Sequence, residues 1–290
     1  MKLQTIQVPD KPLAVAALGD IQFTGSKPRT QMGCNISHLK EHLDWAINGS
    51  HLKGHHVQWI DTGDNVDLMS PSNRDRYRMS GLYSSTTRVI DWHLAEIVEE
   101  LAEIISPYVK GKLVTICRGH HWFEWSSDKL PFMDTERYLG ALLGMESKPN
   151  PGVTESQTVV TFKWPNGAKY KVLAMHGEGN GQTLSYGINK LVRLMGGWDG
   201  IDAVISGHFH KLTAAKTPRL RVSQNGTKLL ERDIRLLTSG SFLRGYMLDD
   251  EMYPETKQWP PLSLGSAALS VYPKKKVDGE WEFETVSLER

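Results

Sequence analysis

Five short apolar runs along this chain each end in a cluster rich in aspartate, histidine and glycine. Short apolar runs bounded by such residues are typical of strands that are buried on both faces of a sheet. In α/β proteins, the loops that follow such strands gather at one edge of the sheet, where ligands bind. We therefore expect the five clusters to lie close together in space. They cover residues 20–22, 63–67, 119–121, 176–177 and 207–210.

Helical patterns alternate with the apolar runs in the first half of the chain. Asn35 precedes the first pattern and is suited to cap it, and Ser84 or Ser85 could cap the second. Gly144 follows the third and could end it, because glycine adopts the left-handed backbone that closes many helices. Helices are expected over residues 36–47, 86–108 and 137–143, and strands over 13–18, 57–60 and 113–117.

The second half of the chain is richer in strand patterns. Pro165-Asn166-Gly167 and Asn225-Gly226 lie between such patterns and predict two hairpins. No internal repeat, low-complexity tract or linker is present, which favours an α/β protein with a single domain over residues 1–290. One more helix is expected over residues 184–195, and strands over 158–164, 170–175, 203–205, both arms of 219–237, 266–272 and 281–286.

The composition excludes several classes of protein. Of the 290 residues, 39% are hydrophobic and 23% are charged, as in ordinary globular proteins, and the net charge of +1 excludes a global basic field for nucleic acid. The two cysteines, Cys34 and Cys117, form no CxxC motif, so a disulfide framework or a thiolate zinc site is not expected. No apolar stretch has the length of a signal peptide or a membrane span. We expect a soluble cytoplasmic protein without a membrane partner, and its oligomeric state stays open.

The residue types in the five clusters indicate metal chemistry. Carboxylates and imidazoles are the ligands that divalent transition metals take, and a shared carboxylate can bridge two such ions. Each cluster alone is a weak signal, because Gly-Asp after a strand is usually a turn and most isolated HxH motifs bind no metal. Five clusters in this order, each after an apolar run, are far more specific.

This ordered set resembles the calcineurin-like metallophosphoesterase family. The family pattern runs DxH, GDxxD, GNH followed by an acidic residue, then a lone histidine, then GHxH. The resemblance implies an α/β layered sandwich of two mostly mixed β-sheets flanked by helices. Residues 176–181 and the later Gly240-Ser241-Phe242 are similar to a phage and bacterial branch, so a phage-encoded protein is one alternative. The matches are Asp20 with Gln22, residues 63–67, residues 119–121, His176 and residues 207–210.

The resemblance implies two divalent metal ions as cofactors, with manganese expected and iron, zinc or magnesium as alternatives. In the family, one aspartate bridges the two ions, and Asp64 occupies its position. The first ion would be bound by Asp20, Gln22, Asp64 and His210. The second ion would be bound by Asp64, His120, His176 and His208.

The same resemblance assigns catalytic roles. His121 fills the position of the family's general-acid histidine, and Asp67 is its expected orienting carboxylate. Arg118 could hold a phosphate oxygen through two hydrogen bonds, or it could be a surface arginine beside a turn. Both readings of Arg118 stay open at this point.

Three positions depart from the family pattern. The DxH histidine is Gln22 here, the GNH asparagine is His120, and the acidic residue after GNH is Trp122. An amide oxygen is a harder ligand than an imidazole, so the first site should favour manganese, magnesium or iron and bind loosely. His120 adds a nitrogen ligand to the second site, which should bind more tightly. A one-metal, strongly asymmetric or inactive protein remains an alternative.

The substrate expected from this reading is a phosphodiester, either DNA or RNA for a nuclease or a nucleotide for a phosphodiesterase. Trp122 and Trp125 could stack on a base, or they could pack on the core. The alternatives are a phosphomonoesterase for a phosphoprotein or metabolite, and a catalytically weak scaffold that keeps the fold. Two groups of basic residues could follow a phosphodiester backbone or be solvated: Arg74, Arg76, Arg78 and Arg88, and Lys211, Lys216, Arg219 and Arg221.

Overall fold

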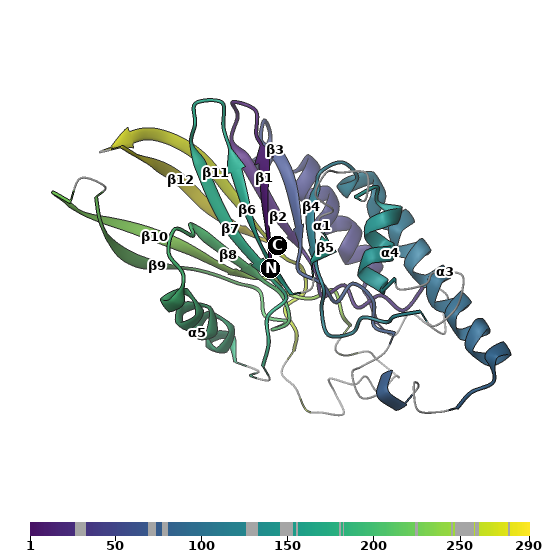
Figure 1. Cartoon of the computed structure of the whole chain (residues 1–290). Helices are drawn as coiled ribbons and strands as arrows, with labels where there is room; N and C mark the ends of the chain where they lie inside the picture. The colour runs from purple at the N-terminus through teal and green to yellow at the C-terminus, as the bar shows by residue number, and fades with distance from the viewer. Residues whose placement is uncertain are drawn as a thin grey trace.

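The computed structural model describes the chain outside residues 27–32, 69–73, 77–80, 126–132, 146–152, 155, 180, 182, 224–225, 245, 247–257, 259–260 and 278. Two six-stranded sheets form its centre (Figure 1). The first sheet contains, in spatial order, β1 (Lys2–Gln7), β6 (Gln157–Lys163), β7 (Lys169–Met175), β8 (Ala203–Ser206), β10 (Leu229–Thr238) and β9 (Thr213–Val222). The second contains β12 (Glu280–Glu289), β11 (Ala267–Val277), β2 (Leu13–Leu18), β3 (His56–Asp61), β4 (Leu113–Cys117) and β5 (Val153–Thr154).

Both sheets are mixed. In the second sheet β2, β3, β4 and β5 are parallel, whereas β11 and β12 pair antiparallel. In the first sheet the pairs of β7 with β8 and of β8 with β10 are parallel, whereas the β6–β7 and β9–β10 hairpins are antiparallel. The expected sandwich of two mixed sheets is therefore confirmed.

Helices cover the outer face of each sheet. Figure 1 shows α1, α3 and α4 on one side of the molecule and α5 on the other. Among the described residues, no helix is both long enough and apolar enough to span a membrane. The helices are α1 (Ile36–Asn48), α3 (Ser84–Val109), α4 (Thr135–Leu142) and α5 (Leu184–Leu194), with short 3₁₀ turns η1 (Ser50–Leu52) and η2 (Met195–Gly197).

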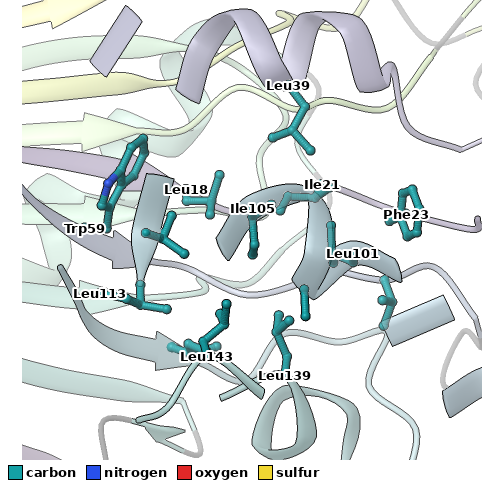
Figure 2. Close-up of a cluster of buried hydrophobic side chains, with 14 of the residues drawn as sticks. Leu18, Ile21, Phe23, Leu39, Trp59, Leu101, Ile105, Leu113, Leu139 and Leu143 are labelled. Atoms are coloured by element: carbon teal, nitrogen blue, oxygen red, sulfur yellow. The ribbon is translucent and has the colours of Figure 1, made fainter. Parts of the chain in front are cut away.

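Three apolar layers hold the sandwich together. The middle layer joins the two sheets and contains Val15 of β2 and Phe162 of β6. A second layer lies between α5 and the first sheet. The third lies under α1, α3 and α4, and Figure 2 shows its side chains pointing toward one another. Because β2 faces two of these layers, all six of its residues are buried, which explains its unbroken apolar sequence.

The structure confirms two of the three predicted helix ends and contradicts the third. The Asn35 side chain accepts a hydrogen bond of 3.2 Å from the backbone N–H of His38, so the predicted N-cap of α1 is confirmed. Gly144 follows the end of α4 with a φ of 75°, as expected for a terminating glycine. The prediction that Ser84 or Ser85 caps α3 is wrong, because both lie inside the helix and Tyr83 precedes it without a side-chain cap.

Two strands have no counterpart in the sequence patterns. The apolar residues of β1 are Leu3 and Ile6, and a single residue of the strand, Gln4, is buried. Within the described residues, β1 pairs with β6 alone, at the edge of the first sheet. The second strand, β5, has two residues. Edge strands and very short strands bury too little apolar surface to produce the pattern that marked the central strands.

The apolar layer of Figure 2 gives the first prediction. Leu101 of α3 is fully buried there, and Leu101→Ala removes apolar contacts and leaves a cavity. We expect the free energy of unfolding, measured by urea denaturation, to fall by about 2–5 kcal/mol. The matched control is Leu142→Ala in α4, where the leucine is 37% exposed. The control should change stability by less than about 1 kcal/mol, and equal losses in both variants would contradict this description of the core.

Candidate metal centre

The five polar clusters meet at the carboxyl ends of β2, β3, β4, β7 and β8. The backbone N–H of Asp20 donates to the carbonyl of Gly63 over 2.8 Å, and that of Gln22 donates to the carbonyl of Asp64 over 3.1 Å. The backbone N–H of His208 donates to Asp20 Oδ2 over 2.8 Å. These contacts join loops that are far apart in the sequence, so the predicted convergence of the clusters is found.

The backbone of these loops is strained at the positions of the expected ligands. Outside glycine, the described residues include six with positive φ, and five of them are expected ligands. Such a conformation costs about 1–3 kcal/mol for a residue with a side chain, and it clusters at functional sites. The five are Asp20 (47°), Gln22 (55°), Asp64 (54°), His208 (72°) and His210 (51°); the sixth is Gln258.

Four side chains form one compact group of possible ligands. Asp64, His120, His176 and His208 each offer one ligand atom, and these atoms lie within 4.8 Å of one another. Asp64 Oδ2 lies 3.1 Å from His176 Nε2, and the Nδ1 atoms of His120 and His208 lie 3.2 Å apart. This group, called the tetrad below, has the composition expected for the second metal ion. Within the described ranges, it is the only such group of three or more histidine, cysteine or acidic residues.

Hydrogen bonds fix which nitrogen of two tetrad histidines faces inward. In the neutral ring, His176 donates from Nδ1 to the carbonyl of Thr62 over 2.8 Å, which leaves the Nε2 lone pair toward Asp64. His208 contacts the carbonyl of Gly179 through Nε2 over 2.6 Å, which leaves Nδ1 toward His120. Metal-binding histidines commonly donate their other N–H to a carbonyl in this way. The tetrad therefore fits a divalent cation.

The residues expected at the first ion form a looser arrangement. Asp20 is fully buried, and its Oδ2 accepts hydrogen bonds from the His208 N–H and from Ser239 Oγ, the latter over 3.1 Å. Its Oδ1 lies 3.4 Å from His210 Nε2 and accepts no hydrogen bond within the described part of the chain. A buried carboxylate oxygen in this state suits a cation. Gln22 is buried in the same turn, at 2% exposure.

The charges of the tetrad depend strongly on one another. Burial lowers the pKa of His176, but the neighbouring Asp64 carboxylate outweighs burial and raises that pKa to about 9. Burial raises the pKa of Asp64, but His176 outweighs burial and holds that pKa below its ordinary value. Burial together with the charges of His176 and His208 lowers the pKa of His120 to about 4. A cation that binds here must displace the proton of His176, so its affinity falls at acidic pH.

His121 and Asp67 form a hydrogen-bonded pair at the rim of the tetrad. His121 Nδ1 lies 2.7 Å from Asp67 Oδ1, and the His121 backbone N–H donates to Asp64 Oδ1 over 2.9 Å. Burial lowers the pKa of His121, but the hydrogen bond that its ring donates to Asp67 and the charges of Asp64 and Asp67 outweigh burial, so the pKa is raised. The ring is still 28% exposed, so a substrate can reach it.

Arg118 lies near the same loop but has protein partners of its own. Its Nη1 is 3.5 Å from Asp134 Oδ2, and its guanidinium carbon is 4.5 Å from the centre of the Trp122 ring. The side chain is 27% exposed. The expectation that Arg118 holds a phosphate oxygen stays a prediction.

The structure decides between the alternatives left open for Trp125 and excludes a solvated position for Arg74. Trp125 is 4% exposed and donates from Nε1 to the carbonyl of Asp91 over 3.0 Å, so it packs in the core and is not a base-stacking platform. Arg74 is 9% exposed and is not part of a solvated basic loop. Arg78 lies outside the described residues. In the second basic group, Lys216 pairs with Asp233 at 2.7 Å and Lys211 is buried.

The supporting roles of two residues were not predicted from the sequence. Ser239 donates to Asp20 Oδ2, and the carbonyl of Gly179 orients His208. Ser239 directly follows β10, whose carboxyl end lies beside that of β8. Its position after a strand could have indicated a place at the site. Serine is too common after strands, however, to be singled out without the structure.

No protein-family model matches the sequence, and no curated protein matches it. Among solved structures, the chain is similar to a predicted phosphoesterase from Streptococcus pneumoniae, with 10% identity over 96% of this chain and 98% of that chain, at a TM-score of 0.33. It is also similar to Vps29 from Chaetomium thermophilum, with 11% identity over 96% and 97% of the two chains, at a TM-score of 0.34. Function is therefore inferred from the side chains of the site.

The close packing around Asp64 gives a prediction at Gly119. A Cβ at this position would lie 2.0 Å from Asp64 Oδ1 and 2.4 Å from the Asp64 backbone nitrogen. Gly119→Ala should therefore displace Asp64, lower stability by about 1–3 kcal/mol and weaken Mn²⁺ binding. Thermal unfolding and calorimetric titration with Mn²⁺ measure the two effects.

The control is Gly196→Ala, because a Cβ at Gly196 meets nothing within 4 Å and the backbone has no positive φ. This variant should match the parent in stability and in metal binding. Wild-type Mn²⁺ affinity in Gly119→Ala would show that Asp64 does not bind the metal in the position described.

Proposed function

We propose that this protein is a metal-dependent phosphodiesterase, acting as a nuclease or on nucleotides. The observation that carries the proposal is the tetrad, with its four ligand atoms within 4.8 Å of one another and the Asp20–His210 pair beside it. The motifs that supply these residues resemble the calcineurin-like metallophosphoesterases, and the fold implied by that resemblance is the fold of this chain. Carboxylates and imidazoles in this ratio suit divalent transition metals.

Two cations would be held by residues of this chain. Bound divalent cations supply a water of lowered pKa and neutralise phosphate oxygens. Asp64 would serve both ions, as the family resemblance implies, and its Oδ2 faces the His176 ring of the tetrad. Asp20, Gln22, Asp64 and His210 would hold one ion, and Asp64, His120, His176 and His208 the other.

The His121–Asp67 pair supports hydrolysis of an ester whose leaving group is an alkoxide. The leaving group of a nucleotide or nucleic acid diester is a sugar alkoxide, which must take up a proton as the bond to phosphorus breaks. Asp67 raises the pKa of His121, which favours the protonated ring, and its hydrogen bond orients that ring. His121 would donate this proton, and Arg118 would bind a nonbridging oxygen of the phosphate.

The two departures at expected metal ligands, His120 and Gln22, have different consequences. His120 lies in the tetrad, with its Nδ1 beside that of His208, which supports its role as a nitrogen ligand of the tighter site. Gln22 would offer an amide oxygen to the other ion, which favours manganese, magnesium or iron over zinc. The protein should therefore lose one metal more easily than the other.

An activity panel tests the proposal. The purified protein would be assayed with a bis-aryl phosphodiester, an aryl phosphomonoester, and single- and double-stranded DNA, each with Mn²⁺, Mg²⁺, Zn²⁺ or Fe²⁺. We expect hydrolysis of diesters, increased by Mn²⁺ and abolished by a chelator. Turnover of the monoester alone would identify a phosphomonoesterase. A protein that binds no metal and hydrolyses no substrate with any of the added metals would identify a scaffold.

Asp64→Asn is the matched variant for this panel. The change keeps the shape of Asp64 but removes the charge that is proposed to serve both ions, so turnover should fall by more than about 100-fold and metal content should fall with it. Asp233→Asn is the control, because Asp233 lies in β10 and pairs with Lys216. Full activity and unchanged metal content in Asp64→Asn would contradict the two-metal assignment.

Comparing substrates with poor and good leaving groups tests the role of His121. His121→Ala should slow hydrolysis of an alkyl diester by about 100-fold or more and that of a p-nitrophenyl diester much less, because a good leaving group needs little protonation. Metal content should stay unchanged. His93→Ala, at a histidine that is 51% exposed on α3, is the control. Equal losses for the two leaving groups would remove His121 from the role of general acid.

The pH profile gives a second readout of the same role. A general acid acts in its protonated form, so activity should fall as the pH rises through the raised pKa of His121. Asp67→Asn removes the carboxylate that raises this pKa. The alkaline limb of the kcat profile should therefore move to lower pH in this variant, and an unmoved limb would contradict the pairing of His121 with Asp67.

A further inference from the structure

Arg74 is a buried arginine that holds the loop after β4. Its side chain is 9% exposed. Its Nη1 donates to the backbone carbonyl of His120 over 2.6 Å and to that of Trp122 over 2.7 Å. Arg74 is more than forty residues from His120 in the sequence. The loop after β4 carries the tetrad ligand His120 and the proposed general acid, His121. A buried guanidinium that donates hydrogen bonds to carbonyl groups of this loop can fix the conformation of the loop.

One of these hydrogen bonds acts on the peptide group that binds Asp64. The carbonyl of His120 and the N–H of His121 belong to the same peptide group, and the described chain contains no cis peptide bond. In a trans peptide these two groups point in opposite directions. Arg74 holds the carbonyl end, and Asp64 Oδ1 accepts from the N–H end over 2.9 Å. The peptide plane is therefore clamped between the arginine and the proposed bridging ligand.

The second hydrogen bond holds the peptide group between Trp122 and Phe123. Arg74 holds the carbonyl of Trp122, and the N–H on the other side of that peptide, from Phe123, donates to Thr135 Oγ1 over 3.2 Å. The Arg74 guanidinium carbon also lies 4.3 Å from the centre of the Trp122 ring. This cation–π contact orients the guanidinium plane. The loop is thus held at two peptide groups on either side of His121.

We propose that Arg74 is a positioning residue for the metal centre, acting through the peptide group between His120 and His121. A cation at the carbonyl end of a peptide polarises it and strengthens the hydrogen bond that its N–H donates. Arg74 thereby sets the orientation of Asp64 and the place of His120 in the tetrad. The effect on metal binding rests on the proposed function, whereas the effect on the peptide does not.

The first arm of the test uses metal-free protein. Histidine-selective ¹⁵N labelling gives backbone amide signals for the 11 histidines, among them His121. In Arg74→Met, which keeps a long side chain without a donor, the His121 amide proton should move upfield and exchange with solvent at least about tenfold faster. Arg74→Lys keeps the charge and should give an intermediate change. Arg76→Met, at an exposed arginine of the same segment, is the control and should match the parent.

The second arm measures Mn²⁺ affinity by electron paramagnetic resonance of the free ion. Loss of a group that orients metal ligands typically weakens binding by about 10–100-fold, and we expect a loss in this range for Arg74→Met and a smaller one for Arg74→Lys. Arg76→Met should bind Mn²⁺ like the parent. Circular dichroism verifies that each variant is folded.

The outcomes separate the two proposals. An unchanged His121 amide in a folded Arg74→Met variant would overturn the role of Arg74, whatever the metal results. If Arg74→Met does not fold, the Arg74→Lys variant decides in the same way. A parent protein that binds no Mn²⁺ would instead contradict the proposed function, and the amide signals would still report on Arg74.

Discussion

The hydrogen bonds of the Asp64 carboxylate connect the parts on which this structure depends. Oδ1 accepts from two consecutive N–H groups, those of His120 and His121, and Oδ2 faces the His176 ring on the other sheet. The backbone carbonyl of Asp64 accepts from the N–H of Gln22. One residue, itself 2% exposed, thus ties together loops that follow β2, β3, β4 and β7. A carboxylate in such a place is stable only while its charge is matched by donors and cations.

The conformation of the site is energetically unfavourable by itself, and the rest of the fold stabilises it. Five of the expected ligands adopt left-handed backbone conformations, and three imidazole rings lie with their centres 4.7–5.1 Å apart. The three apolar layers and the supporting hydrogen bonds of Ser239, Thr62 and Arg74 offset this cost. The arrangement of these ligands therefore lowers the stability of the fold, and a bound cation would offset that loss. Such a local loss of stability is typical of functional sites.

The sequence predicted the central elements and the ligand clusters because both leave local patterns. The unbroken apolar run of β2 marks a strand covered on both faces, and a polar cluster after it marks the edge where loops gather. By contrast, β1 has one buried residue, so its sequence carries no comparable signal. The missed cap of α3 has a different cause, since Ser84 and Ser85 suit the first turn of a helix as well as the position before it.

The contacts that support the site were not predictable in the same way. Arg74 meets His120 and Trp122 across a long sequence separation, and nothing in the residues around Arg74 distinguishes it from the exposed Arg76. The same holds for Trp125, whose burial depends on Asp91 and Tyr138 from two other segments. Residue type indicates which chemistry is possible, whereas only the tertiary structure shows which residues meet.

The most direct test of the metal centre is anomalous diffraction from crystals grown with Mn²⁺. We expect one peak within about 2.0–2.3 Å of Asp64 Oδ2, His176 Nε2 and His208 Nδ1, and a second, weaker peak beside Asp20 and His210. We also expect His120 and Gln22 to point at these peaks. Crystals that contain Mn²⁺ but show no peak at the tetrad would show that these residues do not bind the metal.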